Sequence, residues 1–465
     1  MFELRKHQED ALKAVLESKA GIGRIVIPTG GGKTCVEAFA LREFINEDAR
    51  DIHVVFAPRI ALVNQLIKEY RNFIGQNYIA VAFHSGRHEP DYEKVKWSER
   101  STTSVDVVYE EYQRAVNMDK DLVIFSTYAS AQKLVDAGYQ FDTVIADESQ
   151  YCVAENHFET MRDIVSTRKF FFTATEKHTA TDHGRGLNNE DVFGQVLYQV
   201  APSVLIEKGY IVAPRLHVMS ANRPDDKCTV LDEVIQIAQK QSELSADMPV
   251  TKILYACKGT SDVTKMVEKV DDLKAALPNF KIFTIVSNSK YGAMVDGVKM
   301  GRGDFLKVLR ETDNALIFHY DILSEGIDID GITGVALMRN MGHAKLLQTI
   351  GRAVRIYKAN PAAKKQAWVS VMVVNGNDES SSHLERVVRL IREGGFEVNV
   401  EEVEFTDDVG FGIADDEDID DVVSEDSNGS ALAALENVMH SIEQHEFFQK
   451  IDSSGEGSDL EEFFS

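Results

Sequence analysis

The chain has 465 residues, of which 44% are hydrophobic and 27% charged, and it carries a net charge of −25 at pH 7. Chains of this length have room for about three domains of ~150 residues, and the lack of any run of ~18 apolar residues excludes a transmembrane helix. The charged N-terminus leaves no place for a signal peptide, and four widely spaced cysteines argue against disulfides and structural zinc. We therefore expect a soluble, intracellular protein of the cytoplasm or nucleus that makes no membrane contact.

The negative charge is concentrated at the C-terminus. Residues 401–465 contain 21 acidic residues and one lysine, a net charge of −20, which leaves −5 for residues 1–400. Nucleic-acid binding depends on the local field rather than on the total charge. The acidic composition therefore does not exclude a nucleic-acid groove in the first 400 residues.

Residues 24–46, RIVIPTGGGKTCVEAFALREFIN, predict a buried strand, a glycine-rich turn and a helix. The N–H groups of such a turn point at one spot, where the helix dipole also favours negative charge. The pattern indicates a phosphate site in which Lys33 reaches the β- and γ-phosphates of ATP and Thr34 binds Mg²⁺. Ile27 stands where the general phosphate-loop pattern has its first glycine, and a simple glycine turn before a helix is the alternative.

This segment resembles motif I of superfamily two helicases, in which that first glycine is often replaced. The resemblance implies that the phosphate loop consists of Thr29, Gly30, Gly31 and Gly32. Upstream, Leu4-Arg5-Lys6-His7-Gln8 precedes an amphipathic helix and resembles the Q motif of the same helicases, whose glutamine reads the edge of adenine. Gln8 would then bind the base, and the alternative is a capped surface helix.

Two apolar strands, predicted at residues 52–56 and 122–126, are each followed by a polar turn. The first turn resembles motif Ia, which implies that Arg59 contacts a nucleic-acid phosphate. After the second strand, Thr127 and Tyr128 are similar to the family's Ser-Thr-Tyr motif on the nucleic-acid side. Between these strands, residues 78–83 predict a third strand, and the polar residues 87–121 predict a surface insertion with short helices.

Residues 143–150, TVIADESQ, predict a strand that delivers two adjacent carboxylates to the carboxyl edge of a parallel sheet, where open α/β sheets bind ligands. Asp147 would hold Mg²⁺ through water, and Glu148 would orient and deprotonate the attacking water. An exposed acidic turn is the alternative. The motif is neither DEAD nor DEAH, and Gln150 takes the place of the histidine that senses phosphate in related helicases.

A strand over residues 169–173 leads into Thr173-Ala174-Thr175-Glu176, which resembles motif III. In the family this hydroxyl pair, here Thr173 and Thr175, links hydrolysis to nucleic-acid contact. Residues 191–214 resemble the segment that closes the first domain in restriction-enzyme motor subunits and repair helicases. We place the domain boundary near residues 210–215.

A second alternation follows, with strands predicted at residues 216–220, 252–256, 281–286, 315–318, 334–338 and 368–373. Alternating strands and helices imply parallel sheets with right-handed crossovers. Residues 252–257 resemble motif IV and residues 321–328 resemble motif V. In motif V, Gly326 permits close backbone approach and Asp328 would accept a hydrogen bond from the ribose.

Residues 348–355, QTIGRAVR, resemble motif VI, with Gln348 in the coupling position. Arg352 and Arg355 are three residues apart, so they share one face of a helix and suit bidentate contacts with phosphate. The resemblance implies that they stabilise the charge of the transition state. The alternative is a solvated basic helix.

The remaining segments are a helix and an acidic tail. Residues 381–396 predict a helix that packs on the second domain, and residues 401–430 are acidic with few aromatic residues, which predicts disorder. Residues 431–450 have helical spacing, and the acidic-aromatic end, residues 459–464, could bind a protein partner. A tail that only confers solubility is the alternative.

From these motifs we predict an α/β protein with two tandem RecA-like, doubly wound parallel-sheet domains at residues 1–210 and 211–400, followed by an acidic tail at 401–465. The resemblance implies an ATP-dependent, Mg²⁺-dependent helicase or translocase that moves along nucleic acid, with DNA favoured over RNA. The alternatives are a motor subunit of a restriction or defence complex, an RNA helicase, and a scaffold that binds nucleotide without hydrolysing it.

Overall fold

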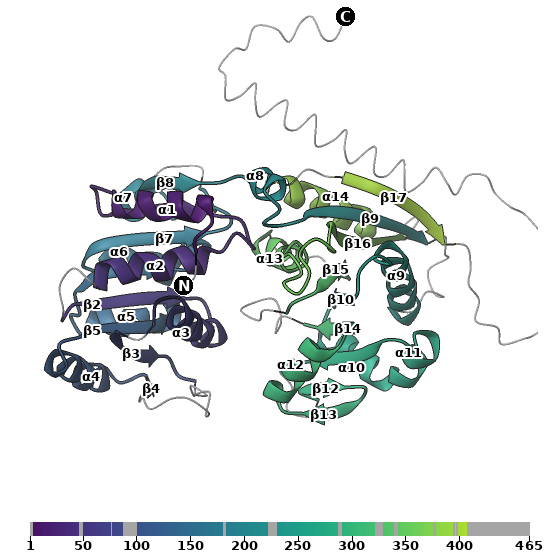
Figure 1. Cartoon of the computed structure of the whole chain (residues 1–465), viewed down its shortest axis with the longest axis horizontal. Helices are drawn as coiled ribbons and strands as arrows, with labels where there is room; N and C mark the ends of the chain where they lie inside the picture. The colour runs from purple at the N-terminus through teal and green to yellow at the C-terminus, as the bar shows by residue number, and fades with distance from the viewer. Residues whose placement is uncertain are drawn as a thin grey trace, which may run out of the picture. The chain divides into compact units, whose positions relative to one another are not determined.

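The computed structural model describes most of the chain up to Thr406. The described residues are 3–45, 50–75, 77–86, 100–179, 183–221, 230–286, 291–320, 329–338, 343–374, 378–393, 396 and 399–406. These residues divide into two compact units, with the division between Ile211 and Val212 (Figure 1). None of the described helices is long and apolar enough to cross a membrane.

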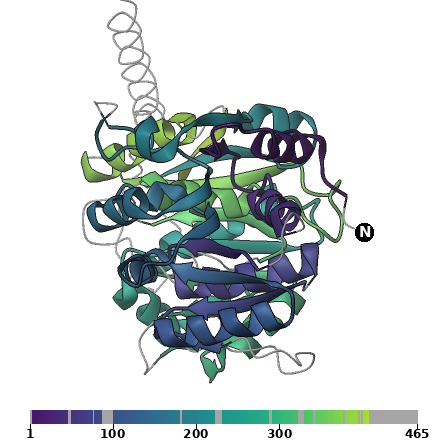
Figure 2. The same cartoon turned by 90° about the vertical axis from the view of Figure 1, so that its left-hand side faces the viewer.

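The first unit contains a sheet whose described strands are all parallel, in the order β4-β3-β5-β2-β6-β7-β1-β8. The strands are β1 (Ile22–Val26), β2 (Ile52–Ala57), β3 (Tyr78–Phe83), β4 (Arg100–Thr102), β5 (Asp121–Thr127), β6 (Phe141–Ala146), β7 (Ser166–Thr173) and β8 (Gln195–Gln199). The helices are α1 (Lys6–Leu16), α2 (Lys33–Ile45), α3 (Ile60–Ile74), α4 (Val105–Asn117), α5 (Tyr128–Asp136), η1 (Ser149–Tyr151), α6 (Glu155–Asp163), α7 (Glu190–Phe193) and α8 (Pro202–Glu207). They cover both faces of the sheet, as Figure 2 shows for this unit.

The central strands of this sheet are apolar because both of their faces are covered. Every residue of β5 is buried, and β2 and β6 are buried from their second or third residue onward. Fully covered parallel strands take continuous Val, Ile and Phe runs rather than an alternating pattern. This is why the sequence located the strands that end at the phosphate loop and at Asp147.

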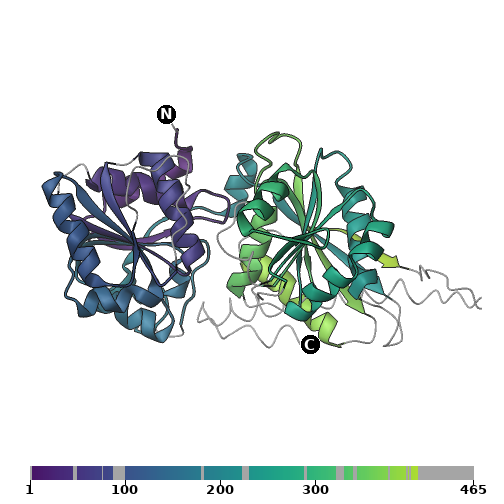
Figure 3. The ribbon, with the colours of Figure 1, turned by 90° about the horizontal axis from the view of Figure 1, so that it is seen from below.

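The second unit has its own sheet, in the order β13-β12-β11-β14-β10-β15-β16-β9-β17, with helices on both faces (Figure 3). Its strands are β9 (Ala213–Ala221), β10 (Thr251–Ala256), β11 (Lys281–Ile285), β12 (Ala293–Val295), β13 (Val298–Met300), β14 (Asn314–His319), β15 (Ile332–Leu337), β16 (Gln366–Val374) and β17 (Asn399–Thr406). Its helices are α9 (Val230–Leu244), α10 (Thr260–Glu268), α11 (Val270–Ala276), α12 (Arg302–Glu311), α13 (His343–Ala353) and α14 (Asp378–Glu393). The predicted α/β class with two parallel-sheet domains is confirmed.

Three parts of the fold differ from the sequence predictions. Of the predicted surface insertion at residues 87–121, residues 87–99 lie outside the described residues. Residues 100–121 belong to the body of the unit, because α4 packs on β3 and β5 and buries Val108 and Ala115. β12 and β13 form an antiparallel hairpin that the predicted βα alternation missed. Its turn is Asp296-Gly297, both with positive φ, which is a recognisable hairpin signal.

The third difference lies at the start of the predicted acidic tail. β17 pairs in parallel with β9 through Thr406, so ordered structure continues past residue 401. The sequence NVEEVEFT carries apolar residues at 400, 403 and 405, which is compatible with a strand. The glutamates between them give the segment the acidic composition that is typical of disorder. Residues 407–465, which contain the rest of the predicted tail, lie outside the described residues.

Candidate functional site

The glycine-rich loop joins β1 to α2, as the sequence predicted. Gly30 and Gly32 have φ values of +87° and +86°, a region that residues with a side chain rarely adopt. A Cβ on Gly31 would lie 2.5 Å from Cγ2 of Ile27, so this position also requires glycine. Lys33 follows as the first residue of α2, and only 8% of it is exposed. Thr29 and Thr34, on either side of the glycines and Lys33, are half-buried.

The two adjacent carboxylates lie at the end of β6, next to this loop. The Asp147 N–H donates to the Phe56 carbonyl of β2 at 2.9 Å, and the residue is 3% exposed. Glu148 has φ +51° and ψ +49°, a left-handed conformation, and its N–H donates to Oδ1 of Asp147 at 2.8 Å. Lys33 Nζ lies 3.7 Å from Glu148 Oε1. The structure thus brings Lys33, Asp147 and Glu148 together.

A third carboxyl group, Glu37, belongs to this cluster and was missed by the sequence analysis. It is fully buried on α2, accepts a hydrogen bond from the Tyr70 hydroxyl at 3.3 Å, and is hydrogen-bonded to the Asp147 carboxyl. Burial and the neighbouring Asp147 carboxylate raise the pKa of Glu37 well above its ordinary value. Burial, followed by the Glu148 carboxylate, also raises the pKa of Asp147, against the lowering effect of the Lys33 ammonium. The available signal was one acid within the otherwise apolar run of residues 35–41, CVEAFAL.

Gln150 connects the carboxylates to the segment after β7. Its Nε2 donates to Glu148 Oε2 at 2.8 Å, and its Oε1 lies 2.7 Å from the Thr173 hydroxyl, which can donate to it. The Thr175 N–H donates back to Thr173 Oγ1 at 3.0 Å. The residues that the sequence assigned to coupling in the first unit therefore form one continuous chain of contacts, which begins at Glu148.

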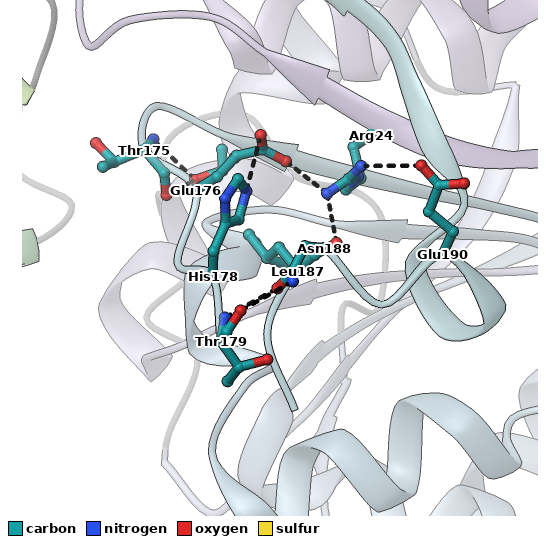
Figure 4. Close-up of polar contacts among 9 residues, drawn as sticks. Arg24, Thr175, Glu176, His178, Thr179, Leu187, Asn188 and Glu190 are labelled. Carbon is teal, nitrogen blue, oxygen red and sulfur yellow. Dashed lines mark hydrogen bonds and ion pairs between the residues drawn. The ribbon is translucent and has the colours of Figure 1, made fainter. Parts of the chain in front are cut away.

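Arg24, in the middle of β1, holds the segment that follows Thr175 (Figure 4). Its guanidinium pairs with Glu176 at 2.9 Å, donates to the Leu187 carbonyl and lies 4.0 Å from Glu190. Asn188 closes the same segment through two hydrogen bonds with the backbone of Thr179, at 2.9 and 3.0 Å. Arg24 is 5% exposed, so this is an arginine inside an apolar strand. A charged residue in the middle of an apolar strand is the sequence signal for this role.

The predicted adenine reader, Gln8, is turned toward the phosphate loop. Its Nε2 donates to the Gly31 carbonyl at 3.0 Å, and its Oε1 accepts from the Arg5 N–H at 2.9 Å. His7 Nε2 lies 2.7 Å from the same Gly31 carbonyl. The Arg5 guanidinium stacks over the ring of Tyr210, 4.5 Å from its centroid.

The predicted nucleic-acid contacts divide into two groups. Arg59 is exposed at the N-terminus of α3, just after β2, where a phosphate could reach it. Tyr128 is 1% exposed, and its hydroxyl donates to the Asp147 carbonyl at 2.6 Å, while Thr127 is 5% exposed. The expected contact through Tyr128 is therefore corrected: its ring packs on Phe56 in the core and supports the strand end that carries Asp147.

The motif VI residues lie on and just after α13 in the second unit. Gln348 and Arg355 are half-buried, and Arg352 is 6% exposed. The C-terminal end of this helix is held by Lys364, whose ammonium donates to the carbonyls of Ile332 at 2.5 Å, Arg355 at 2.7 Å and Ala353. Burial lowers the pKa of Lys364 from 10.5 to about 7. Gly326 and Asp328 lie outside the described residues.

Comparison with known proteins places these observations in a family context. Residues 1–178 match the family described as Type III restriction enzyme, res subunit. No curated protein sequence matches the chain.

Solved structures resemble both units. The Type ISP restriction-modification enzyme LlaBIII bound to DNA matches with a TM-score of 0.66 and 13% identity over 84% of this chain and 30% of that chain. The DEAD-box helicase Mss116 bound to ssRNA and UDP-BeF matches with a TM-score of 0.56 and 14% identity, covering 88% of this chain and 76% of that one. S. cerevisiae Dbp5 bound to RNA and ADP BeF3 matches with a TM-score of 0.53 and 15% identity, covering 86% and 90%.

These matches confirm the resemblance to superfamily two helicases that the motifs indicated. The two-unit α/β fold is the helicase fold, and the family match covers the unit that contains Lys33, Asp147 and Glu148. The chain spans about a third of the length of the restriction enzyme that it resembles.

Proposed function

We propose that this chain is an ATP-dependent nucleic-acid helicase or translocase of superfamily two. The observation that supports it most directly is the convergence of Lys33, Asp147 and Glu148 beside a glycine loop at the carboxyl edge of the first sheet. An ammonium, a buried carboxylate and a second carboxylate beside it are the groups that phosphoryl transfer to water requires.

The residues present fit Mg²⁺. The Thr34 hydroxyl and the Asp147 carboxylate are oxygen ligands of the kind this ion prefers, and within the described ranges no cluster of three or more acidic, His or Cys side chains forms a separate metal site. Burial, and after it the neighbouring carboxylates, raise the pKa values of Glu37 and Asp147, and a bound cation would favour the ionised form of both groups. When bound, Mg²⁺ would neutralise charge on the β- and γ-phosphates.

In this proposal Glu148 orients the attacking water and accepts its proton, while Lys33 and the N–H groups of the glycine loop stabilise phosphate charge. Gln150 links Glu148 to Thr173 and, through it, to Thr175, so a shift of Glu148 would move both threonines. Because the helicase resemblance assigns them this role, we propose that Arg352 and Arg355 stabilise the transition state, an effect on the order of 10³ to 10⁵ in related NTPases.

The remaining assignments also follow the resemblance. Gly326 would permit close approach of the backbone, and Asp328 would accept a hydrogen bond from the ribose. Gln348 would couple hydrolysis to movement, and Arg59 would contact a phosphate of the nucleic acid. Each of the two units would bind the nucleic-acid backbone. When the units open and close, the backbone-binding site of one unit would move relative to that of the other.

We propose that the chain moves along DNA as part of a restriction or defence complex. The resemblance to a DNA-bound restriction enzyme over 84% of the chain, and the absence of a DEAD sequence at residues 147–150, support DNA over RNA. The matched region is 30% of that enzyme, so we propose only the motor function for this chain, acting together with protein partners of the complex. The acidic C-terminal residues, 459–464 in particular, are the segment that we propose binds such a partner.

One assay separates these alternatives: ATP turnover with no nucleic acid, with single-stranded DNA, with duplex DNA and with RNA. The proposal expects turnover that DNA stimulates more than RNA does. Lys33→Ala should lose turnover by losing phosphate contacts, whereas Glu148→Gln should lose turnover but still bind ATP.

Three results would contradict parts of this proposal. A chain that binds ATP without any turnover would be a scaffold, and stronger stimulation by RNA would make it an RNA helicase. A Glu148→Gln variant with the parent rate would remove Glu148 from the mechanism.

A further inference from the structure

Two side chains of α1 converge on one backbone carbonyl of the phosphate loop. His7 Nε2 and Gln8 Nε2 lie 2.7 and 3.0 Å from the Gly31 oxygen, and the two residues are 6% and 3% exposed. A carbonyl oxygen can only accept, so both nitrogens donate and His7 carries its proton on Nε2. Its Nδ1 is buried and has no hydrogen-bond partner among the described residues. The Gly31 carbonyl thus receives two buried donors at once.

These donors fix the orientation of the peptide between Gly31 and Gly32. In a planar trans peptide the C=O and the following N–H point in opposite directions. Holding the Gly31 carbonyl on the side of α1 therefore turns the Gly32 N–H away from α1. Three consecutive glycines have great conformational freedom, and the Gly31 N–H already donates to the Pro28 carbonyl at 2.9 Å. The restraint from α1 therefore keeps the Gly32 N–H available for a phosphate.

Gln8 is also in direct contact with the loop. A Cβ on Gly32 would lie 2.3 Å from Gln8 Nε2, which shows how closely the amide packs on that glycine. The other end of the amide, Oε1, accepts from the Arg5 N–H at 2.9 Å. An adenine edge is read by a donor and an acceptor together. Here the Gly31 carbonyl and the Arg5 N–H take one hydrogen bond at each end of the amide, which fixes its orientation toward the loop.

We infer that His7 and Gln8 are positioning residues for the phosphate loop, and that Gln8 acts on the triphosphate whatever base the nucleotide carries. This inference rests on the proposed function, because it assumes that the loop binds phosphates. It assigns no direct contact with the reacting atoms to either residue. It predicts that removing either donor weakens binding of every triphosphate by the same factor.

The test measures binding by calorimetry and does not require hydrolysis. The full-length chain, with Mg²⁺ present, is titrated with ATP, with GTP and with tripolyphosphate, which has no base. His7→Leu and Gln8→Leu each remove one donor, and each should weaken all three ligands by roughly tenfold, the effect of one lost hydrogen bond at a buried carbonyl. The ratio of ATP to GTP affinity should not change.

Two further variants serve as controls. His7→Gln keeps an N–H donor near the position of Nε2 and should restore most of the affinity, which a purely structural loss of packing would not do. Lys13→Ala alters an exposed residue of the same helix, which pairs with Glu17 at 3.9 Å, and should leave all three affinities unchanged.

Two outcomes would contradict the inference. If Gln8→Leu weakens ATP but leaves GTP and tripolyphosphate unchanged, Gln8 reads the base and the inference is wrong. If His7→Gln binds as poorly as His7→Leu, the Nε2 donor is not what matters. A wild-type chain that binds tripolyphosphate but hydrolyses no nucleotide would overturn the proposed function and leave this inference intact.

Discussion

At the phosphate loop of the first unit, two uncharged donors, His7 and Gln8, serve one carbonyl. In the second unit a single ammonium, that of Lys364, serves three: those of Ala353 and Arg355 at the end of α13 and that of Ile332 in β15. Both arrangements satisfy backbone oxygens in a segment that carries a proposed function. They differ in charge, and therefore in how they respond to pH and in what a substitution removes.

A lysine also serves the last carbonyls of two other described helices. Lys169 donates to Met161 and Ile164 at the end of α6, and Lys252 donates to Leu309 and Arg310 at the end of α12. The last carbonyls of a helix have no partner within the helix, and the dipole places partial negative charge there. A buried ammonium suits that position, whereas a loop that must attract phosphate through its N–H groups is served by neutral donors.

The largest effect is expected from Lys364→Met, which leaves two carbonyls of the motif VI segment and that of Ile332 in β15 without their donor. Leaving buried carbonyl oxygens without a donor costs about 3 kcal/mol in the free energy of unfolding. Turnover should fall as well, because the Arg355 carbonyl is one of the three acceptors. Denaturant unfolding and ATP turnover measure the two effects, and an unchanged unfolding free energy would show that Lys364 is not essential to this segment.

Lys252→Met provides the matched comparison within the second unit. Lys252 also donates to three carbonyls, including that of Asp330 at 3.2 Å, but it holds α12 and not the motif VI helix. We expect a loss of about 2 kcal/mol in unfolding free energy with normal turnover per folded molecule. A loss of turnover equal to that of Lys364→Met would mean that any weakening of this unit impairs catalysis.

The pH dependence of stability should distinguish the two solutions. The pKa of Lys364 is about 7 in the folded chain and 10.5 in the unfolded chain, so between these values the unfolded chain binds more protons. The contribution of Lys364 therefore makes the free energy of unfolding rise with pH from about 7 to 10.5. That component of the slope should be absent in Lys364→Met, and an identical slope in the variant would contradict the lowered pKa.

The smallest expected effect is at His7, whose pKa is lowered from 6.5, mainly by burial. Below pH 6.5 the unfolded chain binds a proton at His7 more readily than the folded chain does, because the pKa is lower in the folded chain. The contribution of His7 to stability therefore falls as the pH falls through this region. His7→Gln should reduce the acid sensitivity slightly and leave the slope above pH 7 unchanged. Thermal unfolding at pH 5.5, 6.5 and 7.5 would detect the change, and equal acid sensitivity in both proteins would argue against it.

The sequence was most informative where a residue's position follows from the chain path alone. The glycine loop that leads to Lys33 follows one buried parallel strand and Asp147 follows another, so their placement at one edge of the sheet follows from strand direction. The partners Glu37 and Arg24 could not be predicted in this way, because each depends on which elements pack together. Tyr128 shows the same limit: its motif places it at a strand end but does not determine that its ring faces the core.

β17 also determines where the chain could be shortened to study its acidic C-terminus. It pairs along the free side of β9 and is the last strand of the second sheet. A chain cut at Val400 would lose most of this strand and leave without partners the N–H and C=O groups of β9 that face β17, while β16 stays paired on the other side. An exposed edge of this kind promotes association between molecules. Such a truncation would combine lost negative charge with self-association. A cut after Thr406 removes the acidic residues that follow while keeping the sheet edge covered.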